Sequence, residues 1–362
     1  MKKPLKNIID PTFYHKNIFK NCLSCLIIFL ILNFQSVFAS SPDSSYYSLD
    51  LAIKGYGLSL GNSKGINGIR INLVDNNVER INGLNITLWK PRRNPNAVIN
   101  GASIGLVSTA AKEINGIAIG TGVAGEKLNG VFWGLLGLGG NEVRGIAVGG
   151  LGAGSGGKMT GIMLGGLGAG AGGEVRGIVA GGIGAGAGSN MKGIIFGGVG
   201  SGVGGDMIGA AFGIIGTGVG GDMKGIALGG VGAGVGGDMT GISVGGIGTG
   251  AGGDFKGIAA GLVGVGCGGK MTGLALGGFG AGAGEEIKGI AFGSLYVRTK
   301  KLTGVGVGGY VKVNNVNGLS IGIVNVTKKL NGVQIGIINY AGNNPKSLRI
   351  LPLINAHIDL SH

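Results

Sequence analysis

The sequence predicts an all-β repeat array, wound as a β-solenoid with about 16 residues per unit. Apolar residues return at fixed distances from a recurring glycine, in short stretches that alternate with small residues, as strands do. Helix is excluded by the 87 glycines among 362 residues, because each glycine inside a helix costs about 1 kcal/mol relative to alanine. The recurring glycine keeps one constant spacing over its whole run, at Gly145, Gly161, Gly177, Gly193, Gly209, Gly225, Gly241, Gly257, Gly273 and Gly289.

The repeat has a constant chemistry when this marker glycine is counted as position 0. Position 1 is mostly Ile, position 3 is often Leu or Phe, position 6 is Leu, Ile, Val or Phe, and position 14 is mostly Met. Alternation over positions 1 and 3, and again over 6, 8 and 10, predicts two short strands with a bend at the Gly-Gly pair of positions 4 and 5. The sequence Gly-Gly-Asp at positions 11 to 13 ends the unit.

A parallel solenoid explains why each position keeps its chemistry, because every position stacks on itself about 4.8 Å away. We therefore expect positions 1, 3, 6, 8, 10 and 14 to point inward. Positions 0, 2, 4, 7, 9 and 11 would then form a smooth outer strip of Gly and Ala. A transmembrane β-barrel is the alternative, because uncharged stretches of about 12 residues separate the charged turns.

The chain divides by composition into a signal segment, a repeat array and two caps. Degenerate repeats flank the regular ones, with Asn-Gly in place of the marker or with slightly shorter or longer spacings. The expected divisions are a signal peptide at 1–39, an N-terminal lead-in and cap at 40–65, degenerate repeats at 66–144, regular repeats at 145–296, degenerate repeats at 297–344 and a C-terminal cap at 345–362.

The N-terminal segment 1–39 has the pattern of a secretory signal peptide. Five lysines precede the apolar run from Leu23 to Leu32, and Val37 and Ala39 stand where a signal peptidase reads. The run is shorter than the roughly 20 residues that a membrane-spanning helix needs. Cleavage after Ala39 removes five Lys and one Asp, which lowers the formal net charge from +14 to +10. Cys267 is then the single cysteine, so an intrachain disulfide is impossible, and we expect a small buried side chain there.

Residues that carry chemistry are scarce in the array. Histidine occurs only at His15, His357 and His362, which excludes a His-dependent triad or a His-rich metal site within the repeats. The glycine patterns are not tied to a strand-to-helix turn, so they do not indicate nucleotide binding. We predict no catalytic, cofactor-binding or metal-binding residue, and a protein that is not an enzyme.

One row of carboxylates and several basic residues near the ends of the array are candidate binding sites for ions, lipid headgroups or nucleic acid. Calcium-binding nonapeptide repeats need a period of nine residues. The aspartates at position 13 recur every 16 residues, so we interpret them as part of a solvated turn. The basic end units are interpreted as solvated caps, with lipid headgroups as a lesser possibility and no nucleic acid, since stacking aromatics are missing there. The aromatic residues Trp89, Trp133, Tyr310 and Tyr340 are expected to pack over terminal turns. The row comprises Asp206, Asp222, Asp238 and Asp254, and the basic residues include Arg70, Lys90, Arg92, Arg93, Arg298, Lys300, Lys301, Lys328 and Lys329.

The outer repeats at 317–325 and 331–340, N-G-L-S-I-G-I-V-N and N-G-V-Q-I-G-I-I-N-Y, resemble those of exported bacterial surface-repeat proteins. That family strings together N-G-[LV]-Q-[IL]-G-[LI]-[VI]-N units behind a signal peptide, and the segment 348–355 also resembles its ending. The central repeats depart from the pattern by replacing Gln and Asn with Gly and Ala. The resemblance implies export across the inner membrane to the cell surface or outer membrane of a bacterium, and it implies no catalytic residue.

The function expected from these observations is structural. We expect a non-enzymatic surface repeat protein of the cell envelope, adhesive or scaffolding, whose partner is an envelope or membrane surface, or a second copy bound through the Gly/Ala face. The alternative is an outer-membrane β-barrel or pore.

Overall fold

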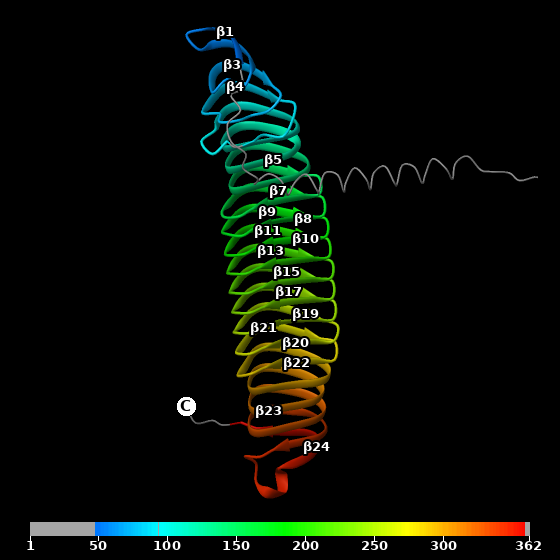
Figure 1. The fold of residues 1–362 in the computed structure, drawn as a ribbon. Helices are drawn as coiled ribbons and strands as arrows, with labels where there is room; N and C mark the ends of the chain where they lie inside the picture. The colour runs from blue at the N-terminus through cyan, green and yellow to red at the C-terminus, as the bar shows by residue number, and fades with distance from the viewer. Residues whose placement is uncertain (1–47, 93, 359–362) are drawn as a thin grey trace, which may run out of the picture. The chain divides into compact units, whose positions relative to one another are not determined.

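The computed structural model describes residues 48–92 and 94–358. Nearly all of them lie in strands wound into a β-solenoid of about 16 residues per turn (Figure 1), which confirms the predicted fold class. No helix in this part of the chain has the length and hydrophobicity to cross a membrane. The predicted signal peptide, the start of the lead-in at 40–47, Arg93 and residues 359–362 lie outside the described residues.

Each regular turn contains one long strand at positions 14 to 4 and one short strand at positions 7 to 10. The long strands are β7 (Met159–Gly165), β9 (Val175–Gly181), β11 (Met191–Gly197), β13 (Met207–Gly213), β15 (Met223–Gly229), β17 (Met239–Gly245), β19 (Phe255–Gly261) and β21 (Lys270–Gly277). The short strands are β6 (Gly152–Ser155), β8 (Gly168–Ala171), β10 (Gly184–Ala187), β12 (Gly200–Val203), β14 (Gly216–Val219), β16 (Gly232–Val235), β18 (Gly248–Ala251), β20 (Gly264–Cys267) and β22 (Gly280–Ala283).

Continuous strands and small caps complete the two ends. The strands β5 (Val98–Gly149) and β23 (Glu286–Ala341) run through several turns without a break. At the N-terminal end, β1 (Ser48–Ile53) pairs antiparallel with β2 (Tyr56–Gly61). β2 stacks in parallel on β3 (Gly65–Asn72), and β3 in turn stacks on β4 (Arg80–Thr87). At the C-terminal end, a 3-10 turn, η2 (Lys346–Leu348), leads into β24 (Ile350–His357), which pairs antiparallel with the end of β23.

The turns of the solenoid stack in parallel, and each is offset from the next by one repeat. In the pair β15–β17, for example, Met223 lies beside Met239 and Gly225 beside Gly241. The bends are bonded in the same way, since the Ile183 amide donates to the Leu167 carbonyl oxygen at 2.7 Å. Each repeat position therefore stacks on itself, as a solenoid requires and as an up-and-down antiparallel barrel does not.

The interior is filled by repeat positions 14, 2, 8 and 10. Position 14 supplies the largest side chains, and position 2 supplies mostly Ala. The fully buried members at position 14, each at most 1% exposed, are Val143, Met159, Val175, Met191, Met207, Met223, Met239, Phe255, Met271 and Ile287.

The inward assignment of positions 1, 3 and 6 is wrong. Ile226 at position 1 is 38% exposed, and Val231 at position 6 is 44% exposed. The long strand runs unbroken from Met223 to Gly229, so side-chain alternation places positions 1 and 3 on the face opposite to Met223. Position 6 lies in the bend between the two strands, where alternation does not apply. Positions 2 and 4, expected outside, are consequently inside.

The marker glycines form one column along the array. Between Gly68 and Gly332 each has φ between +117° and +147°, a region that L-residues rarely adopt. A Cβ placed on any of them would lie 1.8–2.3 Å from the carbonyl oxygen of the marker glycine in the turn before. The degenerate repeats share this column, so they are copies of the same turn.

A pair of alanine substitutions in β15 tests the inside and outside assignments. We expect Met223→Ala to lower the free energy of unfolding by about 2–5 kcal/mol, because it removes a fully buried side chain. Ile226→Ala, on the outer face of the same strand, should cost about 1 kcal/mol or less. Denaturant titration of both variants measures the difference, and the reverse order would contradict the assignment.

Candidate binding surfaces

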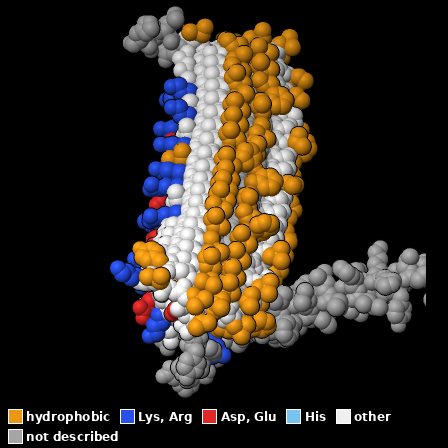
Figure 2. All heavy atoms as spheres, turned by 90° about the horizontal axis from the view of Figure 1, so that it is seen from above, with side chains coloured by type: hydrophobic (Ala, Val, Ile, Leu, Met, Phe, Trp, Pro, Cys, Tyr) orange, Lys and Arg blue, Asp and Glu red, His pale blue; other side chains and the backbone are white. Residues whose placement is uncertain are grey.

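Two rows of apolar side chains point outward along the long strands. They occupy positions 1 and 3, and we call them together the apolar face. Figure 2 shows such side chains as a band along the solenoid. Exposed apolar areas of this extent are rare on monomeric proteins and mark sites of interaction. Members exposed by 37–49% include Ile146, Leu164, Ile178, Ile194, Phe196, Ile226, Ile242, Val244, Ile258, Leu276, Ile290 and Phe292.

A row of cations runs beside the apolar face, at position 15 of the same long strands. Arg176 pairs with Glu174 at 2.9 Å and Arg144 with Glu142 at 3.6 Å, all at the surface. Such exposed pairs contribute at most about 1 kcal/mol each, so this row affects solubility and contacts more than stability. The row comprises Arg144, Arg176, Lys192, Lys224, Lys256 and Lys288, which all lie exposed.

The carboxylates at position 13 hold successive turns together. Oδ1 of Asp206 accepts a hydrogen bond from the Asp222 amide at 2.9 Å, and Oδ1 of Asp222 accepts one from the Asp238 amide at 2.8 Å. The ladder starts at Asn190, whose side-chain oxygen accepts from the Asp206 amide at 2.8 Å. These side chains are exposed, as expected of a solvated turn, and their oxygens satisfy backbone donors.

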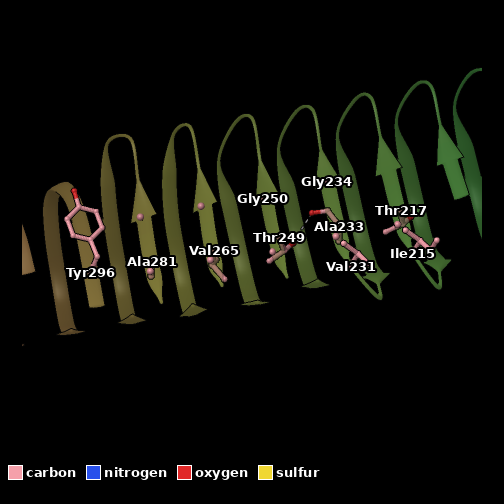
Figure 3. Close-up of a pocket in the computed structure, with 17 residues that line it drawn as sticks. Ile215, Thr217, Val231, Ala233, Gly234, Thr249, Gly250, Val265, Ala281 and Tyr296 are labelled. Carbon is pink, nitrogen blue, oxygen red and sulfur yellow. Dashed lines mark hydrogen bonds between the residues drawn. The ribbon is translucent and has the colours of Figure 1, made fainter. Parts of the chain in front are cut away.

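A ridge and a trough lie next to each other along the short strands. The ridge is formed by position 6, and the trough by the glycines at positions 7 and 9. Part of the trough is a shallow open groove of about 930 Å³, bounded by ridge residues such as Ile215 and Val231 and ending at Tyr296 (Figure 3). The ring of Tyr296 stacks on that of Tyr310, with centroids 6.1 Å apart. The ridge residues, 44–56% exposed, are Leu151, Leu167, Ile183, Val199, Ile215, Val231, Ile247, Val263 and Phe279.

The N-terminal turns have a polar interior. Arg70, expected in a solvated cap, is instead fully buried and forms an ion pair with buried Asp75. Its guanidinium also donates to Asn85 at 2.8 Å and Asn62 at 2.6 Å. Burial of the charge is tolerated because these partners compensate it. The arrangement is a structural network at the inward positions 2 and 4 of these turns, while position 14 keeps buried apolar residues such as Ile66 and Ile81.

The remaining charged and aromatic end residues that the structure describes lie at the surface or near it. Trp89 and Trp133 are 50% and 55% exposed, so these two side chains are not buried against the terminal turns as expected. Lys301 pairs with Glu286 at 3.0 Å, and hydrogen bonds from Lys301 and Thr303 lower the pKa of the Glu286 carboxyl. These contacts fix the first degenerate turn after the regular array.

The exposed apolar rows are the main feature that the sequence interpretation missed. A signal was present, because Lys224 must reach solvent and stands two positions before Ile226. On one continuous strand both side chains therefore share the outer face. The same spacing recurs wherever position 15 is Lys or Arg.

Comparison with known proteins adds no assignment. No protein-family model, curated protein or solved structure matches the chain. Within residues 48–92 and 94–358, no group of three or more His, Cys, Asp or Glu side chains could hold a metal ion. The candidate binding surfaces are therefore the apolar face and the trough with its ridge.

Cys267 provides a titratable group at the edge of the interior. It is half-buried at position 10, and its Sγ lies 3.7 Å from the Gly269 carbonyl oxygen. Burial, and then the nearby carboxylate of Asp254, raise the pKa of this thiol from 9.0 to about 11. The thiol is thus protonated and weakly reactive at neutral pH.

The raised pKa predicts a loss of stability in alkali. The folded state holds the thiol proton more tightly than the unfolded state, so this contribution is complete below pH 9 and is lost as pH rises through about 11. We expect the melting temperature of the protein to fall relative to that of Cys267→Ala over this range. A constant difference in melting temperature between the two proteins from pH 8 to 11 would contradict the raised pKa of Cys267.

Proposed function

We propose that the chain is a non-enzymatic structural protein of the bacterial cell envelope, exported by its N-terminal segment, that acts as an adhesive or scaffold. It binds an envelope surface through the apolar face. The observation that carries this proposal is the run of outward Ile, Leu, Val and Phe side chains at positions 1 and 3 of the regular array, interrupted by Ala180, Ala210 and Ala260. The signal-like pattern of residues 1–39 and the resemblance of the outer repeats to exported surface-repeat proteins support the location.

The energetics favour an apolar contact that is weak per turn and strong over the array. A side chain that is about two-fifths exposed regains on the order of 1 kcal/mol when it is covered. The twelve exposed members of the two rows give on the order of 12 kcal/mol before the costs of association. The cations of position 15 add attraction to anionic headgroups, about 1 kcal/mol each, but the carboxylates two positions away offset them. The apolar contribution therefore dominates.

The proposal is tested by making the apolar face polar while leaving the ridge unchanged. The face variant carries Ile194→Thr, Ile226→Thr, Ile242→Thr and Ile258→Thr, all at exposed position 1. The matched ridge variant carries Val199→Thr, Val231→Thr, Ile247→Thr and Val263→Thr, at exposed position 6. Fractionation of producing bacteria measures the share of protein in the envelope, and an external protease measures its surface exposure.

We expect the unmodified protein and the ridge variant to sediment with the envelope and to be cleaved from outside. For the face variant, the ratio of soluble exported protein to envelope-bound protein should be at least tenfold higher than for the unmodified protein. Recovery of the unmodified protein in the cytoplasm, or full envelope retention of the face variant, would contradict the proposal.

A further inference from the structure

Most of the glycines that floor the trough are not required by the fold. None of those at positions 7 and 9 has a positive φ. A Cβ at Gly202, Gly218 or Gly234 would meet nothing within 4 Å, in contrast to the marker glycines. At Gly170, Gly248, Gly250 and Gly282 a Cβ would lie 3.1–3.3 Å from a carbonyl oxygen of the next turn, which is tight. Glycine in a strand costs about 0.5–1 kcal/mol relative to alanine, so the other trough positions give up stability without a steric reason. In the nine turns with an exposed ridge residue these glycines are Gly152, Gly154, Gly168, Gly170, Gly184, Gly186, Gly200, Gly202, Gly216, Gly218, Gly232, Gly234, Gly248, Gly250, Gly264, Gly266, Gly280 and Gly282.

The trough and the ridge have the same extent. The exposed ridge runs from Leu151 to Phe279, and glycine pairs of the trough occupy those same turns. Both continue together into the turn before, where Gly137 and Gly139 stack on Gly152 and Gly154 and Leu136 holds position 6. In the turn after Phe279, Tyr296 stacks on Gly280 and Arg298 on Gly282, which ends the flat floor. A projecting row and a hollow of equal length thus lie side by side on one face.

We propose that two copies of this chain pack side by side and in parallel, with the ridge of each copy seated in the trough of the other. A twofold axis parallel to the solenoid axis produces this arrangement, because it places each ridge opposite the partner's trough. A twofold axis perpendicular to the solenoid, within the contact plane, would set ridge against ridge. Such isologous pairs are the commonest form of assembly among soluble proteins.

A second copy fits the trough because the two surfaces share one period. Ridge side chains recur once per turn, about 4.8 Å apart, and so do the glycine positions of the trough. Two copies in register therefore match at every turn without any adjustment of spacing. A partner of another kind would have to reproduce this spacing independently.

The chemistry of the trough also calls for an apolar occupant. Its backbone groups are committed to neighbouring turns by the parallel pairing of β14, β16 and β18. The hydroxyls beneath it are satisfied internally, since Thr249 donates to the Ala233 carbonyl oxygen at 3.1 Å and Thr217 lies 2.9 Å from Ser201 Oγ. The floor offers shape and apolar contact, which the ridge side chains match (Figure 3).

The available area suffices for a stable pair. Nine turns at about 4.8 Å and four strand residues at about 3.3 Å give a patch of roughly 43 by 13 Å. Two such patches bury on the order of 1,100 Å², above the ~1,000 Å² expected of a specific interface. This proposal does not rest on the proposed function, because the apolar face stays uncovered in the pair.

Filling the trough should abolish pairing without unfolding the chain. The test variant is Gly218→Arg with Gly234→Arg, where open space receives the new side chains. The control is Thr240→Arg, at exposed position 15, where Arg144 and Arg176 occur naturally. Sedimentation equilibrium of protein purified from the exporting cells measures mass, and circular dichroism measures folding.

We expect a dimer for the unmodified protein and the control, and at least a hundredfold weaker pairing for the trough variant. If the trough variant fails to fold, Val231→Lys with Ile247→Lys tests the ridge instead, with the same expected loss of the dimer. A monomeric unmodified protein, or a variant that folds and pairs as tightly as the control, would overturn the proposal.

Cross-linking distinguishes the parallel pair from other arrangements. Position 7 is the trough position that adjoins the ridge, next to the proposed axis. A Cβ at Gly168, Gly232 or Gly264 would make only ordinary contacts at 3.7–3.8 Å. In a Cys267→Ala background, Gly168→Cys, Gly232→Cys and Gly264→Cys should each give a covalent dimer with a short bis-maleimide. Thr240→Cys should give none. Cross-linking at one of the three sites alone, or equally at Thr240→Cys, would refute the parallel register.

Discussion

The stacking of the marker glycines is the constraint on which the rest of the structure depends. Their positive φ directs the missing Cβ at a carbonyl oxygen of the turn below, so only glycine allows the backbones to meet there. The column runs from Gly68 to Gly332, through repeats that share little else. Differences in repeat length are therefore absorbed elsewhere in the turn, while this point stays in register.

Side-chain alternation along the long strand determines which positions fill the interior and which are left outside. A Met at position 14 faces mostly Ala at position 2 and small residues at positions 8 and 10. The buried Met supplies about 1.5–3 kcal/mol per turn. The Ile and Leu or Phe of positions 1 and 3 are placed on the opposite face, where the exposed members leave about two-fifths of their surface uncovered in the described chain. The stability of the array and its exposed apolar surface thus have one origin.

Sequence alone could predict the architecture, because the even period and constant position chemistry require every position to stack on itself. It did not predict the orientation of the long strand. Placing a unit boundary at Gly225 separated Met223 from Ile226, although they lie on one strand and face opposite ways. Lys224 indicated the correct orientation, because a lysine must reach solvent and Ile226 lies two residues later on the same strand face. Arg70 was unpredictable for another reason, since its partner Asp75 lies in a loop whose path the repeat pattern does not determine.

The two classes of glycine could not be separated by composition. Gly225 and Gly234 both recur once in every regular repeat, yet one fills a site closed to any side chain and the other faces open space. Only the backbone conformation shows that the first is a requirement of the fold and the second a property of the surface. The candidate surfaces depend on this distinction more than on any single side chain.

The most direct test of this account is the thermal unfolding of Gly225→Ala beside that of Gly234→Ala. The first places a Cβ 1.8 Å from the Gly209 carbonyl oxygen at a φ of +139°, so we expect a loss of several kcal/mol or failure to fold. The second should leave stability unchanged or raise it by up to about 1 kcal/mol. Equal effects of the two substitutions would contradict the central claim.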